Sequence, residues 1–254
     1  MEKFYNIDEQ RVWNEKSMWL EGGNEWSSSF ITTENLWNKE IFDFIKDFRG
    51  KKIVEIGPGF GRMTQFLSIL ASELIVIDLN SLCIEKTKEK LGHHVLAYFT
   101  NDGKTLTGVR DNSQDLVFSF DSFVHMHANV TEEYVKEIFR VLKPGGQAFI
   151  HHSWLYGGSE NSFDNSGGRA NMSPEQFKVF VENNNMKIVS RFSLFVLVLM
   201  SAHLLKAQNP SPKIVVGLVV DQMRWDYLYK YKDRYGEDGF NRLLSNGFTC
   251  ENTI

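Results

Sequence analysis

The sequence has few cysteines, no cluster of basic residues and no apolar run long enough to span a bilayer. Its two cysteines, Cys83 and Cys250, lie in unrelated contexts, so neither a disulfide framework nor a zinc motif is indicated. The net charge of −4 gives no reason to expect nucleic acid as a partner. The apolar run 192–205 is shorter than the roughly 20 residues of a membrane-spanning helix. We therefore expect neither a bound metal nor a stable membrane insertion.

The size and the start of the sequence indicate an ordinary intracellular protein. With 254 residues, 42% hydrophobic and 24% charged, the chain can form one sizeable α/β domain, with or without an appendage. The first ten residues, MEKFYNIDEQ, are polar and acidic, which argues against a conventional export signal at that position. We expect a cytoplasmic protein.

Strand-like and helix-like segments alternate from about residue 33 to residue 190. Short apolar runs predict five strands, at 51–56, 74–78, 94–99, 115–120 and 147–152. Periodic segments between and after them predict helices at 34–48, 62–71, 82–91, 131–142 and 174–183. This alternation predicts a doubly wound, mostly parallel α/β sheet with helices on both faces. Such sheets bind ligands at the carboxyl ends of their strands, here the loops after residues 56, 78, 100 and 120.

Four small polar residues are expected to begin these helices: Thr33, Ser81, Thr131 and Ser173. Pro174 and Gln176 strengthen the last of these signals, because they supply a first-turn proline and a capping-box side chain. The helix that follows Thr131 is expected to stop at the breaker sequence KPGG, residues 143–146.

A glycine-rich turn, Gly57-Pro58-Gly59-Phe60-Gly61, follows the first predicted strand directly. Glycine lets the backbone approach a ligand closely and tolerates positive φ. The spacing is G-x-G-x-G, and Arg62 stands where a dinucleotide fingerprint has its third glycine. The preceding Glu55 would repel a pyrophosphate but attract a ligand that carries ammonium and sulfonium groups. The motif therefore predicts a cationic, phosphate-free cofactor; the alternative is a tight turn that binds nothing.

Two further acidic residues follow the second and third strands. Asp78, 23 residues after Glu55, can accept both hydroxyls of a ribose, or it can simply cap the next helix. Asp102, within Asn101-Asp102-Gly103, can reach an adenine amino group, or it can form an Asp-Gly turn.

Five segments in order resemble the motifs of class I S-adenosylmethionine-dependent methyltransferases: VEIGPGFGRMTQFL, VIDLNSLCIEKTKEKLG, NDG, DLVFSFDSFVHMH and FRVLKPGGQAFIHHS. The resemblance covers roughly residues 10–190. It implies a Rossmann-like fold and S-adenosyl-L-methionine as the cofactor. It also implies that Glu55, Gly57 and Gly59 face the methionine part, Asp78 the ribose and Asp102 the adenine. The remaining residues of the implied cofactor site are Pro58, Gly61, Leu79, Asn101 and Gly103.

Methyl transfer is an in-line displacement, so the protein mainly positions the acceptor. A hydroxyl acceptor benefits from a general base, whereas an amine can react once it is desolvated. The candidate catalytic residues are Asp121, His125, His151 and His152. Histidine titrates near neutrality, the first two residues follow the fourth strand, and the last two lie at the end of the fifth. Neighbouring strand residues point to opposite faces, so only one of the last two is expected to face the site. The alternative for each histidine is a hydrogen-bonded structural role.

Upstream tryptophans and a short leader precede this domain. Trp13, Trp19, Trp26 and Trp37 either cover the cofactor or acceptor or pack on the domain. The leader WLEGGNEWS, residues 19–27, resembles that of a bacterial subgroup found with polysaccharide biosynthesis. That resemblance implies a glycan or a related small molecule as the methyl acceptor.

The segment MKIVSRFSLFVLVLMSAHLLKAQ, residues 186–208, has the layout of a secretory signal peptide within the chain. Lys187 and Arg191 form a basic region before the apolar run, and Ala207 provides a small residue after it. Residues 209–254 resemble the beginning of a bacterial alkaline phosphatase, with Asp221 matching a zinc ligand of that family. A single carboxylate makes no zinc site, so no phosphatase activity is expected.

Three explanations of this segment remain open: a join of two unrelated genes, final sheet strands at 192–200 and 213–220, or an internal membrane anchor. We divide the chain into an N-terminal cap segment (1–32), a methyltransferase domain with atypical or replaced last strands (33–191), the signal-like segment (192–208) and the phosphatase-like fragment (209–254).

The sequence thus predicts a methyltransferase that acts on an oxygen or nitrogen atom of a small molecule or glycan. The alternatives are a degenerate S-adenosylmethionine-binding domain without turnover and a nicotinamide-dependent dehydrogenase. The oligomeric state is not indicated by the sequence.

Overall fold

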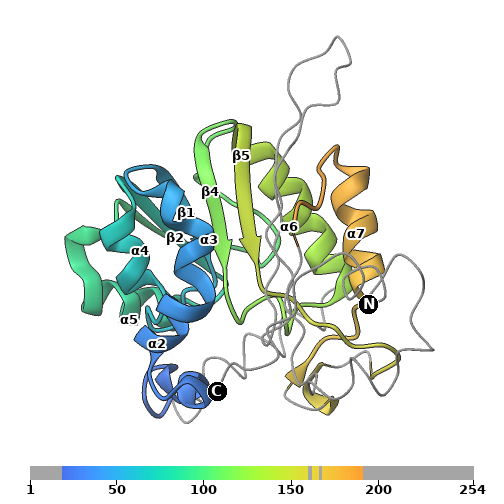
Figure 1. The fold of residues 1–254 in the computed structure, drawn as a ribbon, viewed down its shortest axis with the longest axis horizontal. Helices are drawn as coiled ribbons and strands as arrows, with labels where there is room; N and C mark the ends of the chain where they lie inside the picture. Colours follow the sequence, from blue (N-terminus) through green and yellow to red (C-terminus); the bar gives the residue numbers. More distant parts are fainter. Residues whose placement is uncertain (1–18, 160–161, 166–167, 191–254) are drawn as a thin grey trace, which may run out of the picture. The chain divides into compact units, whose positions relative to one another are not determined.

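The computed structural model describes residues 19–159, 162–165 and 168–190, all within the first of two compact units, Met1–Asp221 and Gln222–Ile254. Its centre is a five-stranded sheet with the order β3-β2-β1-β4-β5 (Figure 1). The strands are β1 (Lys52–Ile56), β2 (Glu73–Asp78), β3 (Ala97–Thr100), β4 (Gln114–Ser119) and β5 (Leu142–Ile150). All four pairings are parallel, which confirms the predicted doubly wound α/β fold. The strand order reverses between β1 and β4, where such sheets bind their ligands.

Consecutive residues of β1 contribute to two separate cores, because side chains alternate across a strand. Val54 and Ile56 pack in the core shared with α6 (Ala128–Val141) and α7 (Pro174–Asn183). Ile53 packs in the other core, which includes residues of α2 (Thr33–Leu36), α3 (Phe42–Ile45), α4 (Thr64–Leu70) and α5 (Ser81–Leu91). Helices therefore cover both faces of the sheet (Figure 1).

Two of the predicted helix starts are displaced by one residue. The cap of α2 is Thr32, whose hydroxyl accepts the N–H of Asn35 at 3.1 Å. The cap of α5 is Asn80, whose side chain accepts the N–H of Leu82 at 3.0 Å. Both capping residues have the extended backbone that this position requires. Ser173 caps α7 as predicted.

The prediction that Thr131 begins a helix is wrong. Helix α6 begins at Ala128 after His127, which has the extended conformation, and Thr131 lies fully buried inside the helix. The helix ends at Val141, and β5 follows at the next residue. The KPGG segment belongs to β5, where the pairing with β4 shifts register between Gln114 and Leu116. This shift in the strand pairing accommodates the glycines and proline that predicted only a break.

The predicted helix over 34–48 is a series of short helical segments. After α2, a π-type turn covers Trp37–Ile41, and after α3 a 3-10 turn covers Lys46–Phe48. The expected apolar face is present, since Trp37, Ile41 and Ile45 are buried. After α7, residues 186–190 form no strand, and the expected features from residue 191 onward lie outside the described part of the chain.

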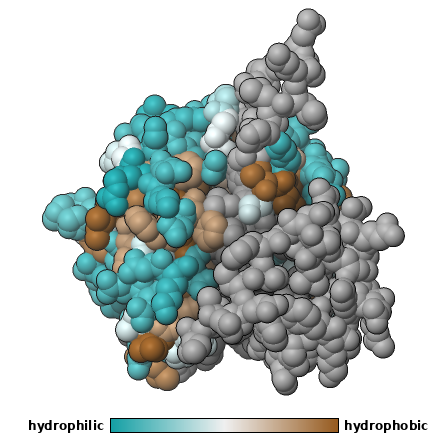
Figure 2. Space-filling model, in the orientation of Figure 1, coloured by the Kyte–Doolittle hydropathy of each residue, from teal (hydrophilic) through white to brown (hydrophobic). Residues whose placement is uncertain are grey.

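The visible surface of the described residues is largely hydrophilic, with apolar residues scattered among polar ones (Figure 2). Single exposed apolar residues are normal on a surface that faces water. Within the described ranges, no helix is long and apolar enough to cross a membrane.

Candidate functional site

The glycine turn after β1 is held against the loop after β4. Gly57 has a φ of 71°, and a Cβ atom added there would lie 1.8 Å from Ser122 Oγ. Gly59 has a φ of 55°, and its added Cβ would lie 2.7 Å from the ring of Trp19. Because an L side chain rarely adopts such φ values and no space is left for one, both positions require glycine. The turn therefore presents bare backbone at the switch point of the sheet.

Glu55 is a buried carboxylate at the end of β1. It is 2% exposed, and its Oε2 atom has no hydrogen-bond partner among the described residues. Burial raises the pKa of Glu55 to about 8, so the side chain is mostly protonated at neutral pH in the ligand-free protein. A buried carboxyl oxygen without a partner is costly unless a ligand supplies one.

Asp78 is the last residue of β2, the strand next to β1 in the sheet, and its carboxylate accepts hydrogen bonds from nearby backbone N–H groups. Its Oδ1 atom accepts the N–H of Asn80 at 2.8 Å, and its Oδ2 atom lies 3.4 Å from the N–H of Gly59. Burial raises the pKa of Asp78 to about 7 despite these bonds. The carboxylate thus supports the turns after two neighbouring strands and also lines the pocket.

A single pocket joins these strand ends. It has about 900 Å³ of empty space, a volume that includes its mouth open to solvent. The predicted cofactor residues that line it are Glu55, Gly57, Pro58, Gly59, Asp78, Leu79 and Gly103. Gly61, Asn101 and Asp102 are not among its lining residues. Two predicted catalytic residues, Asp121 and His125, also line the pocket.

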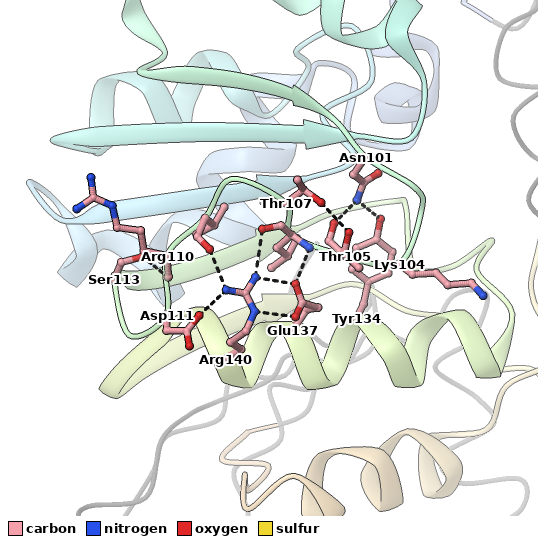
Figure 3. Close-up of polar contacts among 12 residues, drawn as sticks. Asn101, Lys104, Thr105, Thr107, Arg110, Asp111, Ser113, Tyr134, Glu137 and Arg140 are labelled. Atoms are coloured by element: carbon pink, nitrogen blue, oxygen red, sulfur yellow. Dashed lines mark hydrogen bonds and ion pairs between the residues drawn. The ribbon is translucent and has the colours of Figure 1, made fainter.

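The loop after β3 uses the side chains of Asn101 and Asp102 to stabilise itself. Asp102 Oδ1 accepts the N–H groups of Lys104 and Thr105 at 3.0 and 2.8 Å. Asn101 Nδ2 donates to Thr105 O at 2.6 Å and to the hydroxyl of Tyr134 on α6 at 2.9 Å (Figure 3). The part of this loop that borders the pocket is Gly103.

Helix α6 fixes the rest of that loop through a polar network around Arg140 (Figure 3). Arg140 donates to Asp111 Oδ1 at 2.7 Å and to the carbonyl oxygens of Val109 and Leu106 at 2.9 and 3.2 Å. Glu137 binds Arg140 and accepts the N–H of Leu106 at 2.8 Å. These contacts set the position of Gly103 relative to the sheet.

Asp121 follows β4 in a left-handed backbone conformation, with a φ of 61°. One carboxylate oxygen forms an ion pair with Arg62, and the other lies 2.8 Å from His151 Nδ1. Burial alone would raise the pKa of Asp121, but the charge of Arg62 and then that of His151 hold it well below its usual range. Asp121 is therefore ionised at any working pH. A strained backbone at such a position is typical of functional sites.

His125 is a neutral imidazole on the pocket wall. Burial lowers its pKa to about 4, and its Nδ1 atom lies 2.6 Å from the carbonyl oxygen of Gly168. In the neutral ring, Nδ1 is then the protonated nitrogen and Nε2 carries the lone pair.

His151 and His152 are both fully buried and do not line the pocket. The ring of His151 packs beside Phe120 at 4.7 Å and lies behind Asp121. The ring of His152 stacks on Phe177 of α7 at 4.1 Å. The side chain of His151 thus contacts two residues that line the pocket, Phe120 and Asp121.

Sequence patterns predict no role for several pocket residues. Arg62 is only a departure from a dinucleotide motif, and Ser122 and Tyr134 belong to no predicted site. Arg62 meets Asp121 across 59 residues of sequence, a contact that no local pattern announces. In the described ranges, no group of three or more His, Cys, Asp or Glu side chains is placed to hold a metal ion.

The sheet topology and the pocket at the strand ends define a doubly wound α/β domain of the cofactor-binding class. Residues 54–150 match the family model of the methyltransferase domain. This matched segment is similar to a methyltransferase domain and includes all five strands in whole or in large part.

Relatives of two kinds match the chain. The phosphoethanolamine N-methyltransferase of Triticum aestivum is 29% identical over 119 residues, which is 46% of this chain and 24% of the wheat protein. The relatives of the second kind match only 43 residues, which is 17% of this chain. Over that length the chain is 74% identical to a calcium-transporting ATPase of Myroides odoratus and 65% identical to the alkaline phosphatase PafA of Elizabethkingia meningoseptica. The chain spans only 8% of each of those two proteins.

A solved structure supports the fold. Phosphoethanolamine N-methyltransferase 2 of Haemonchus contortus, in complex with phosphomonomethylethanolamine and S-adenosylhomocysteine, aligns with a TM-score of 0.53 and 20% identity. The alignment covers 68% of this chain and 44% of the Haemonchus chain.

Proposed function

We propose that the domain transfers the methyl group of S-adenosyl-L-methionine to a small-molecule or glycan acceptor and releases S-adenosylhomocysteine. The observation that carries the proposal is the side-chain-free turn at Gly57 and Gly59, set between the buried carboxyls of Glu55 and Asp78. A pyrophosphate would meet two carboxyls there, whereas an ammonium group and ribose hydroxyls would find acceptors. The match of residues 54–150 to a methyltransferase domain supports the same conclusion.

In this proposal, Glu55 and the glycine turn hold the methionine part of the cofactor and Asp78 holds the ribose. The partnerless Oε2 atom of Glu55 suits a ligand that brings a hydrogen-bond donor. The adenine lies toward Gly103, beside the loop that Asn101 and Asp102 stabilise. Gly61, Pro58 and Leu79 shape the turns around it.

The bound cofactor supplies a methyl carbon activated by a sulfonium. The lone pair of the acceptor forms the new bond to that carbon, the S–C bond breaks, and its electron pair remains on a neutral thioether sulfur. The methylated acceptor then releases one proton to solvent. The protein contributes by aligning the acceptor with the methyl group and by excluding water.

His125 and Asp121 are the proposed residues of the acceptor side. A histidine with a pKa near 4 is neutral at physiological pH but is a weak base. It suits a nitrogen acceptor, which reacts as the free amine, better than an alcohol. The relatives that carry the name phosphoethanolamine N-methyltransferase support nitrogen as well. His151 acts through Asp121, and the position of His152 against Phe177 favours a packing role.

Calorimetric titration of the full chain with S-adenosylhomocysteine tests the proposal. We expect binding to one site, and no binding of NADH in a parallel titration. Absence of S-adenosylhomocysteine binding by folded protein would sink the proposal, and NADH binding would restore the dehydrogenase alternative. Incubation with S-adenosylmethionine and a panel of amines, alcohols and sugars then tests turnover. Binding without turnover on any acceptor would favour a degenerate cofactor-binding domain.

For the remainder of the chain, we keep the boundaries drawn from the sequence: a methyltransferase domain to residue 191, a signal-like segment (192–208) and a phosphatase-like fragment (209–254). The short matches to the Myroides and Elizabethkingia proteins support a join between two unrelated genes. An internal signal is not read as an N-terminal one, so the cytoplasm remains the proposed location. Sequencing the source DNA across codons 180–215, with the intact mass of the product, tests the join; a continuous native reading frame would contradict it.

A further inference from the structure

Arg62 occupies an unusual position between three segments that are distant in sequence. The residue is 5% exposed, although it carries a permanent charge. Its Nη2 atom pairs with Asp121 after β4, and its Nη1 atom donates to Ser27 Oγ at 3.0 Å. Its guanidinium carbon lies 5.8 Å from the centre of the Trp26 ring and 5.5 Å from that of Phe120. One side chain thus connects the glycine turn, the loop after β4 and the N-terminal segment.

The N-terminal segment in question, residues 19–30, forms a cover over one wall of the pocket. Trp19 stacks on Phe60 of the glycine turn, with ring centres 4.4 Å apart and planes within 5°. Trp19 and Trp26 both line the pocket and pack edge to face at 5.0 Å. Ser27 is 1% exposed, and its Oγ atom also lies 3.0 Å from Thr33 Oγ1 at the start of α2.

We propose that Arg62 is a positioning residue that fastens this cover to the pocket and thereby slows the release of the cofactor. The inference rests on the proposed function for the identity of the cofactor, but the fastening itself is a property of the ligand-free chain. The Arg62 side chain forms hydrogen bonds both to Ser27 in the cover and to the carboxylate of Asp121.

Arginine suits this task because its planar fork of N–H groups can serve two acceptors in fixed directions. Asp121 neutralises the guanidinium and keeps it in place. To Arg62, the cover presents the Ser27 hydroxyl and the Trp26 ring, contacts that can break while the ion pair stays intact. The cover can therefore open while the charged anchor remains in position beneath it.

The test uses variants that weaken the cover's contacts but leave the ion pair. Ser27→Ala removes the acceptor for Arg62 Nη1 and also for Thr33 Oγ1, and Trp26→Leu removes the ring, so variants of Arg62 isolate the contribution of the guanidinium. Ser29→Ala is the matched control, because Ser29 is an exposed serine in the same segment. Arg62→Lys and Arg62→Gln complete the set, with circular dichroism to confirm that each is folded. The first two variants keep the proposal testable if a change at Arg62 prevents folding.

Hydrogen exchange without ligand gives the first readout. We expect the amides of residues 22–31 to exchange about tenfold faster in Ser27→Ala and Trp26→Leu, because local opening responds to the loss of local contacts. The amides of β1 and β4 should keep the exchange rates of the wild type. Unchanged exchange in the cover of both variants would overturn the proposal.

Stopped-flow binding of S-adenosylhomocysteine gives the second readout. We expect the dissociation rate to rise about tenfold and the association rate to change little, since contacts that hold a bound ligand act mainly on its release. Ser29→Ala should behave as wild type in both measurements. Faster exchange with an unchanged dissociation rate would overturn the positioning role. If the wild type binds no S-adenosylhomocysteine, the proposed function fails, and the exchange result alone still decides whether Arg62 fastens the cover.

Discussion

Gly57 and Ser122 are in such close contact that a single added carbon would collide with the serine hydroxyl. The Cβ of an alanine at position 57 would lie 1.8 Å from Ser122 Oγ and 2.6 Å from Ser122 Cβ. The turns after β1 and β4 are thus fitted to each other at the switch point of the sheet.

The first prediction is that Gly57→Ala destabilises the fold and abolishes cofactor binding. The positive φ costs about 1–2 kcal/mol for an L residue, and relieving the clash costs about 1–3 kcal/mol more. Gly50→Ala is the control, because Gly50 has a φ of 74° but no atom within 4 Å of its added Cβ. Urea unfolding should show a clearly larger loss of unfolding free energy for position 57. Equal losses would mean that the contact with Ser122 relaxes freely.

The second prediction concerns the buried carboxyl of Glu55. Glu55→Gln should weaken the binding of S-adenosylhomocysteine by about 1.5–3 kcal/mol, the range for hydrogen bonds to charged groups. Stability should not fall, because a neutral amide replaces a carboxyl that burial already disfavours. Calorimetry and thermal unfolding measure the two effects, with the exposed Glu85→Gln on α5 as the control. Unchanged affinity would place the cofactor's ammonium elsewhere.

The third prediction is a pH dependence of binding. Burial raises the pKa of Glu55 to about 8 and that of Asp78 to about 7, so both must lose protons to bind a cationic ligand as carboxylates. Affinity for S-adenosylhomocysteine should rise by roughly 10- to 100-fold from about pH 6.5 to about pH 8 by linkage. In Glu55→Gln the rise should be much smaller, which separates the protein's titration from that of the ligand. A profile identical in both proteins would refute the assignment to Glu55.

The raised pKa of Glu55 makes the ligand-free protein less stable as pH rises, whereas cofactor binding strengthens over the same range. Between the ordinary pKa of 4.5 and about 8, folded Glu55 holds a proton that the unfolded chain has released. Unfolding free energy should therefore fall as pH rises through this window. The contribution of Glu55 is measured by plotting unfolding free energy against pH for both proteins. It equals the difference in slope between wild type and Glu55→Gln.

The fourth prediction separates the two roles of Asp78. Asp78→Ala should weaken the binding of S-adenosylhomocysteine by about 1–3 kcal/mol, through the loss of charge-assisted bonds to the ribose. Asp78→Asn keeps an oxygen for the N–H of Asn80, so it should retain stability while still losing affinity. Wild-type affinity in Asp78→Asn would show that the residue acts only as a support for the turn.

The fifth prediction concerns the ion pair of Asp121. Asp121→Asn leaves the Arg62 charge buried without its partner, which should lower the unfolding free energy by about 3–5 kcal/mol. Because the pKa of Asp121 is lowered, its carboxylate stabilises the fold fully at pH values above the ordinary pKa of a carboxyl group. This stabilisation is lost as pH falls below that pKa. Asp43→Asn is the control, since Asp43 pairs with Lys46 on the surface. Equal stability of the two variants would contradict this account.

The elements of the sheet could be predicted because buried parallel strands are short apolar runs between glycines and polar turns. Strands β1, β2 and β4 lie within one residue of their predicted bounds at each end. Strand β5 begins five residues early, because proline and glycine are compatible with a bulge as well as with a break. Local patterns cannot distinguish these two outcomes.

The candidate site could be predicted where one motif contains the whole feature. The glycine turn is such a case, since its need for bare backbone is visible in the sequence. Asp102 was ambiguous because one carboxylate can reach a ligand or its own turn, and the structure has it bonded to Thr105. Arg62 could not be found, because its partners Ser27 and Asp121 are 35 and 59 residues away.

The side chains of β1 point alternately to the two faces of the sheet, and this alternation limits where residues can be inserted or deleted. Ile53 packs in one core, and Val54 and Ile56 pack in the other. Glu55 lies between Val54 and Ile56 in the sequence and lines the pocket. Deleting one residue near Lys52 would turn every later side chain of the strand to the opposite face. Glu55 would then take the position of Val54 in the core shared with α6, and Ile56 would take the position of Glu55 before the glycine turn. Single-residue insertions and deletions in β1 are therefore excluded, whereas the loops before it remain free to vary.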